Sequence, residues 1–217
     1  GTTRPLPIAG AVTTTVAFGS SNNAIALNLS GGVATSVTVA SAPAHGTATA
    51  SGTGIAYTPT AGFSGSDTFT YTAVGTGGTS APATVTITVN PQAPVVGNVS
   101  LTVEVNSTNN VVPLALSGGA AASVAVVTAP THGVATVSGT SITYTPTSGF
   151  YGADSFTYSA TNVTGTSAPG TVTLLVQSRP DPTKDAEVKG LINAQVAVAN
   201  RFAQAQIGNF QSHLEGL

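Results

Sequence analysis

Short alternating runs of apolar and polar residues fill most of the first 177 positions of the chain. In the first half these runs cover residues 12–18, 24–29, 37–39, 47–50, 55–58, 67–73 and 84–89. Alternation with period two is typical of β-strands that have one buried face. The pattern predicts seven short strands in fewer than 90 residues. Gly31-Gly32, between the second and third runs, can supply the positive φ of a hairpin.

The whole pattern occurs twice. A shift of 87 residues overlays the sequence on itself without a gap, and more than half of the positions match. For example, Ala42-Pro43-Ala44-His45-Gly46 returns as Ala129-Pro130-Thr131-His132-Gly133. Such a repeat indicates two copies of one domain. We therefore predict an all-β fold of two tandem seven-stranded immunoglobulin-like β-sandwiches, residues 5–90 and 91–177, followed by an amphipathic α-helix.

One motif in each copy resembles the immunoglobulin strand-F pattern Asp-x-Ala-x-Tyr-x-Cys. It reads Asp67-Thr-Phe69-Thr-Tyr71-Thr-Ala73 in the first copy. The resemblance implies that Tyr71 is a corner tyrosine, with its hydroxyl bonded to nearby backbone. It also places Ala73 where the disulfide cysteine would be. Tyr158 and Ala160 repeat the arrangement.

A longer pattern resembles the bacterial Ig-like and cadherin-like repeats of large surface adhesins. It consists of Pro-x-His-Gly-x-Val/Ala, then Tyr-Thr-Pro-x-x-Gly-Phe-x-Gly-x-Asp-x-Phe-x-Tyr, and it occurs in both copies. The resemblance covers residues 5–177. It implies an extracellular setting on a bacterial cell surface, and it implies no particular ligand.

The composition of the chain argues against several classes of function. Charged residues make up only 6% of the chain and the net charge is −2, so electrostatic binding to nucleic acid is not expected. There is no Cys, which excludes thiol catalysis and Cys-ligated metal. No apolar run approaches the ~18 residues of a membrane-spanning helix.

The titratable side chains of the sandwiches are few. His45 and His132 occupy matching turns, and Asp67, Glu104 and Asp154 are the only acidic residues between 5 and 177. Zinc needs three or four ligands close together, and calcium needs six to eight oxygens. We therefore expect structural roles for these residues, with no metal, no cofactor, no catalytic residue and no enzymatic activity.

The composition changes in residues 178–217. Most of the charged residues of the chain lie here, and apolar residues follow helical spacing over 183–216. Asp181, with Pro182 at the first helical position, or Thr183 can cap this helix. A partner is expected for its apolar stripe, either another copy or another segment, although folding back onto the second sandwich is the alternative. The candidate partner-binding residues are Leu191, Ile192, Val196, Phe202, Ile207, Phe210 and Leu214.

The tail also resembles the segment that precedes the outer-membrane β-barrel of proteobacterial autotransporters. The resemblance lies in Ala194-Gln195 and in residues 201–215. It implies a stalk or adhesin passenger fragment that is associated with the outer membrane, in which the helix docks onto a translocator or onto another copy. Two alternatives stay open, a subunit of an extracellular filament and a carbohydrate- or matrix-binding module. A carbohydrate- or matrix-binding module needs exposed aromatic residues, for which Phe18 and Tyr151 are the candidates.

Overall fold

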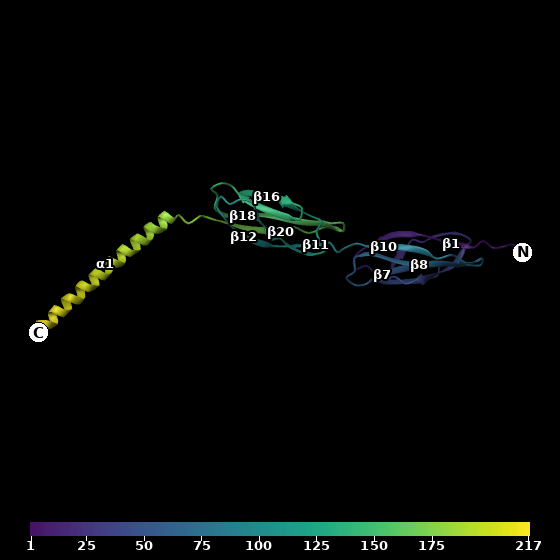
Figure 1. Cartoon of the computed structure of the whole chain (residues 1–217), viewed down its shortest axis with the longest axis horizontal. Helices are drawn as coiled ribbons and strands as arrows, with labels where there is room; N and C mark the ends of the chain where they lie inside the picture. The colour runs from purple at the N-terminus through teal and green to yellow at the C-terminus, as the bar shows by residue number, and fades with distance from the viewer.

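The computed structural model describes the chain from Gly1 to Leu217. Two β-sandwiches lie end to end, and a single long helix projects beyond the second (Figure 1). The strands of the first sandwich are β1 (Pro7–Gly10), β2 (Val12–Val16), β3 (Asn23–Ile25), β4 (Asn28–Gly31), β5 (Ala34–Ser41), β6 (Gly46–Ser51), β7 (Gly54–Pro59), β8 (Gly65–Gly75), β9 (Gly78–Thr79) and β10 (Ala83–Val89). Those of the second are β11 (Pro94–Gly97), β12 (Val99–Glu104), β13 (Asn110–Val111), β14 (Ala115–Gly118), β15 (Ser123–Thr128), β16 (Gly133–Ser138), β17 (Ser141–Pro146), β18 (Gly152–Asn162), β19 (Gly165–Thr166) and β20 (Gly170–Gln177). The helix α1 spans Pro182–Glu215.

Each sandwich packs a larger sheet against a smaller one. In the first, the larger sheet has the order β2-β10-β8-β5, and β9 pairs with the end of β8. The smaller sheet has the order β3-β7-β6, and β1 pairs with β4. The second sandwich repeats this topology with β12-β20-β18-β15, β13-β17-β16 and β11-β14. The predicted fold class, two tandem Ig-like sandwiches followed by one helix, is confirmed.

The strand count differs from the prediction for a topological reason. The run expected over residues 24–29 is two strands, β3 and β4, which belong to different sheets. Strands β1 and β9 were not predicted, so ten strands replace the expected seven. Gly31 does adopt a positive φ of 71°. However, β4 pairs with β1 and β5 pairs with β8, so the predicted hairpin at Gly31-Gly32 is wrong.

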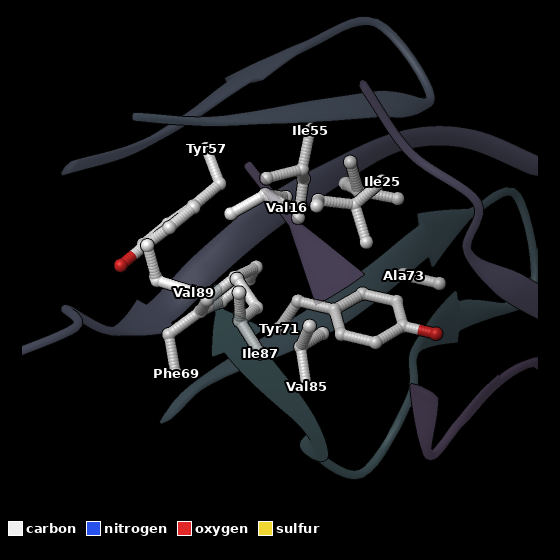
Figure 2. Close-up of a cluster of buried hydrophobic side chains, with 11 residues drawn as sticks. Val16, Ile25, Ile55, Tyr57, Phe69, Tyr71, Ala73, Val85, Ile87 and Val89 are labelled. Atoms are coloured by element: carbon white, nitrogen blue, oxygen red, sulfur yellow. The ribbon is translucent and has the colours of Figure 1, made fainter. Parts of the chain in front are cut away.

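A separate hydrophobic core fills each sandwich. Eleven buried side chains form the first core, and eleven at matching positions form the second. The alternation of β8 directs Phe69, Tyr71 and Ala73 inward, against Val85 and Ile87 of β10 (Figure 2). Because neither core borrows residues from the other, each sandwich is expected to unfold as its own unit.

The predicted corner tyrosine, Tyr71, holds together strands that are far apart in the sequence. The Tyr71 hydroxyl donates to the carbonyl of Gly10, at 2.7 Å, and lies 3.2 Å from that of Asn28. Both carbonyls belong to the β1–β4 pair, 61 and 43 residues away in the chain. The predicted bond from this hydroxyl to nearby backbone is confirmed, and its partners lie far away in the sequence. Tyr158 makes the equivalent bond to Gly97, at 2.8 Å.

Replacing either tyrosine with phenylalanine should destabilise only its own sandwich. We expect Tyr71→Phe to lower the free energy of unfolding of the first sandwich by about 1–2 kcal/mol, since it removes one hydroxyl and leaves a carbonyl unpaired. Tyr158→Phe should do the same in the second. Hydrogen exchange read by mass spectrometry separates the two sandwiches. Equal protection in wild type and variant would show that this bond does not stabilise the fold.

The linker between the sandwiches is held against the second one. Asn162 donates from Nδ2 to the carbonyl of Gln92 at 2.7 Å, and the Thr164 hydroxyl donates to the carbonyl of Pro91. A Cβ on Gly119 would lie 1.7 Å from the Gln92 oxygen, so only glycine lets the linker pass here. These side-chain bonds stiffen a short linker that its prolines already restrict. Both bonds hold the linker on the second sandwich, at the junction between the two sandwiches that Figure 1 shows.

Candidate functional site

The helix that carries the predicted partner-binding residues begins at a built cap. Asp181 has extended backbone and accepts a hydrogen bond from the Thr183 N–H at 2.9 Å. Pro182 occupies the first helical position, where no N–H is needed. Asp185 in the first turn and His213 in the last complement the helix dipole. The first of the two predicted caps, Asp181, is the one that forms.

All seven predicted partner-binding residues lie on α1, and each is more than half exposed. The two aromatic rings are among the most exposed, with 68% for Phe202 and 66% for Phe210. The helix as a whole has no buried residue. A shallow groove runs between Leu191 and Phe202 along one side.

The alternative in which α1 folds back onto the second sandwich is wrong for this structure. Figure 1 shows α1 projecting away from both sandwiches, joined only by the segment around residues 178–181. No side chain of α1 is buried against either sandwich. No stretch of α1 is apolar enough over sufficient length to cross a lipid bilayer.

A buried carboxylate organises the turn that contains each predicted histidine. Asp67 accepts hydrogen bonds from the N–H groups of Ala44 and His45, at 3.1 and 3.0 Å. It also accepts one from the Tyr57 hydroxyl at 2.8 Å and one from the Thr68 N–H at 3.0 Å. The structural role expected for Asp67 is thus that of a carboxylate that accepts backbone N–H bonds. The second sandwich repeats every one of these bonds around Asp154.

The tyrosine that completes this cluster was missed by the sequence analysis. Burial, the hydrogen bond to Asp67 and the negative charge of that carboxylate together raise the pKa of the Tyr57 phenol. Tyr57 therefore serves as a permanent hydrogen-bond donor rather than an acid. The sequence contained one signal for this pairing, which is its spacing. Tyr57 precedes Asp67 by ten residues, and Tyr144 precedes Asp154 by ten.

The histidines are packed as parts of these turns. The ring of His45 stacks on Phe63 with centroids 4.4 Å apart, and that of His132 stacks on Phe150 at 4.2 Å. His45 Nδ1 lies 3.8 Å from an Asp67 oxygen. No group of three or more His, Asp or Glu side chains comes together anywhere in the chain. One partly exposed imidazole and one saturated carboxylate supply too few free ligands for zinc or calcium.

We therefore expect the stability of both sandwiches to be independent of divalent metal. The two acidic residues of the repeats that are buried, Asp67 and Asp154, already use their oxygens on N–H and O–H donors. Calorimetric melting with EDTA and with added Ca²⁺ should give the same melting temperatures. A ligand that binds only the native state stabilises it, so a clear fall in EDTA would refute this expectation.

The second sandwich should lose stability in acid through Asp154. Burial alone would raise the pKa of this carboxyl, but the hydrogen bond from Tyr144 and three backbone N–H bonds outweigh burial and hold the pKa below its usual range. An unfolded Asp titrates near pH ~3.9. This contribution is therefore complete above that pH and is lost as the pH falls through the lower folded pKa. Urea unfolding at pH 7 and pH 3 tests it, and Asp154→Asn should lack this part of the acid sensitivity.

The two aromatic residues named as candidates for a sugar-binding surface differ in exposure. Tyr151 is the exposed aromatic residue of the sandwiches, at 67%, and Phe18 is partly buried. Tyr151 borders a groove with Leu175, Gln177 and Pro180, close to the start of α1. A single ring at the end of the rod offers one stacking surface.

The family described as bacterial Ig domain matches residues 5–88 and again residues 91–175. The chain belongs to the bacterial Ig domain family. The paired match coincides with the two repeats and leaves out α1. The resemblance of residues 5–177 to bacterial Ig-like repeats is thus supported, whereas nothing in the comparisons supports the resemblance of the tail to autotransporters.

Solved structures place these bacterial Ig domains near cadherins in fold. The extracellular cadherin domains 3-6 of protocadherin gamma B2 superpose with a TM-score of 0.51 at 13% identity, covering 81% of this chain and 53% of that one. The ectodomain of human desmocollin-1 gives 0.46 at 9% identity, covering 79% of this chain and 41% of that one. The chain thus spans about half of each structure. No curated protein sequence matches the chain. The first superposition shows a shared fold alone.

Proposed function

We propose that this chain is a non-enzymatic stalk or adhesin fragment of a bacterial cell surface, with α1 as the element that joins it to a partner. The observation that carries the proposal is the arrangement of two bacterial Ig domains in a rod, with a wholly exposed helix that bears an apolar stripe at one end. Rigid sandwiches in series extend a chain away from its attachment point. The non-enzymatic part of the proposal is supported by the scarcity of titratable side chains in the sandwiches, where no three His, Asp or Glu residues come together.

Antibody labelling of the native bacterium tests the surface location. An antibody against the first sandwich should label intact cells, because a stalk exposes its outer domains. A second antibody against a cytoplasmic protein should label only permeabilised cells. Labelling by the first antibody that also requires permeabilisation would overturn the proposal.

A filament subunit is the second candidate. Beyond the clusters at Asp67 and Asp154, the two sandwiches carry almost no charge, so closely packed copies would not repel one another. Electron microscopy of the purified chain distinguishes the two. Extended fibres that grow with concentration would favour the filament, and separate rods or small clusters of rods would favour the stalk.

A further inference from the structure

Several positions of α1 keep their apolar or polar character at intervals of eleven residues. One apolar series is Val188, Ala199 and Phe210, a second is Ile192, Ala203 and Leu214, and a third is Val196 and Ile207. Polar positions keep the same interval, in Lys189–Asn200–Gln211, Asn193–Gln204–Glu215 and Gln195–Gln206. Eleven residues complete three turns at about 3.67 residues per turn, so each series keeps one direction along the helix. We call the eight residues of the three apolar series the repeat stripe.

The repeat stripe contains no charged residue, and no other part of the chain covers it. Every one of its residues is exposed in α1. The charged residues that follow Val188, namely Lys189, Arg201 and Glu215, fall outside the stripe when eleven residues are wound into three turns. Any surface that covers the stripe therefore removes apolar side chains from water without burying a charge.

We propose that the repeat stripe is covered by the same stripe of other copies of this chain, in a parallel bundle of at least three α1 helices. This inference rests on the proposed role of α1 as the joining element. Equivalent layers that recur every three turns are what a helical bundle requires, because each layer meets an identical layer of its neighbours. A partner surface without a repeat of its own would not require polar residues to recur at the same interval as the apolar ones. An eleven-residue repeat also predicts a slight right-handed supercoil.

Two glutamines favour the parallel orientation. Gln195 and Gln206 border the repeat stripe, and an amide both donates and accepts hydrogen bonds. In a parallel bundle in register, each meets its own copies at one height and can pair with them. An antiparallel pairing that matched Gln195 with Gln206 would instead place Ile192 against Asn209, and Leu214 against Glu187. Polar residues at such positions are known to fix register and orientation.

The contact area available on α1 favours two neighbouring helices over one. A helix of 34 residues is about 50 Å long, and a contact strip about 10 Å wide along it covers roughly 500 Å². Specific protein interfaces cover roughly 800 Å² on each partner. A second neighbour would double this area to roughly 1,000 Å² on each helix. Leu191 and Phe202, which lie beyond the glutamines, widen the apolar arc toward a second neighbour.

Matched alanine substitutions in the full chain test the proposal. Ala203 lies in the repeat stripe and Ala205 lies on the opposite side, and both are exposed. In analytical ultracentrifugation the wild type should sediment with at least three times the mass of one chain. Ala203→Glu should reduce it to a single chain, whereas Ala205→Glu should not change it. A monomeric or dimeric wild type, or equal masses for the two variants, would overturn the proposal.

The orientation is tested with a single cysteine in a chain that has none. Leu217→Cys places one thiol just after the end of α1, where it should form a disulfide between copies of a parallel bundle under mild oxidation. In an antiparallel bundle the two thiols would be about 50 Å apart and would stay reduced. A reduced thiol in an associated chain would overturn the parallel arrangement. Neither outcome bears on labelling of the cell surface, so the two proposals fail separately.

Discussion

Asp67→Asn should destabilise the first sandwich by about 3 kcal/mol and leave the second unchanged. The carboxylate accepts four hydrogen bonds, three from backbone N–H groups and one from the Tyr57 hydroxyl. Its side chain is only 2% exposed. Asparagine keeps one oxygen but turns an NH₂ group toward donors, so at least one N–H or O–H loses its acceptor inside the protein. Hydrogen bonds to a charged group are the stronger kind, which makes their loss costly.

The repeat provides the control for this substitution. Asp154→Asn should produce the same loss in the second sandwich and spare the first. Hydrogen exchange under increasing denaturant, read by mass spectrometry on peptides from each sandwich, measures both in one experiment. If Asp67→Asn left the unfolding of the first sandwich where it was, the carboxylate would not be what holds the His45 turn.

The sequence was sufficient for the features that depend on local pattern or on repetition. The 87-residue repeat predicted two sandwiches, because each copy contains all the strand-like runs that one immunoglobulin-like sandwich needs. The helix was predicted over 183–216 and is found over Pro182–Glu215, since Asp181 and Pro182 define its start. Its free apolar face also follows from the spacing of side chains.

Features that depend on which strands become neighbours were beyond the sequence. Strand β4 leaves the sheet that contains β3 and pairs with β1, and no local signal at residues 24–29 reports that change. The partners of the Tyr71 hydroxyl follow from the same pairing. An immunoglobulin-like motif identified the tyrosine, but the carbonyls that it reaches are set by tertiary structure.

Positions that break the repeat became interpretable only with the linker in place. Gly75 and Gly77 of the first copy correspond to Asn162 and Thr164 of the second. In the second copy these two side chains bind the linker carbonyls of Gln92 and Pro91. This difference between the copies is visible in the sequence. Its structural role follows from the course of the linker, which crosses the β18–β19 turn.

Gly133→Ala should destabilise the second sandwich by about 2–3 kcal/mol, because the added methyl group has no room. A Cβ at this position would lie 2.5 Å from Cε2 of Tyr144 and 2.6 Å from both Cζ and the hydroxyl oxygen. The ring is fully buried, and its hydroxyl is bound to Asp154 at 2.8 Å. Tyr144 therefore cannot move aside without giving up that bond.

Gly165 of the same sandwich is the matched control, since a Cβ there would meet nothing within 4 Å. Gly165→Ala should change the free energy of unfolding by less than about 0.5 kcal/mol, as is usual for surface substitutions. Urea unfolding followed by hydrogen exchange in the second sandwich compares the two variants. Similar stability for Gly133→Ala and Gly165→Ala would mean that the turn at His132 shifts freely, and that the cluster of Tyr144 and Asp154 does not fix it.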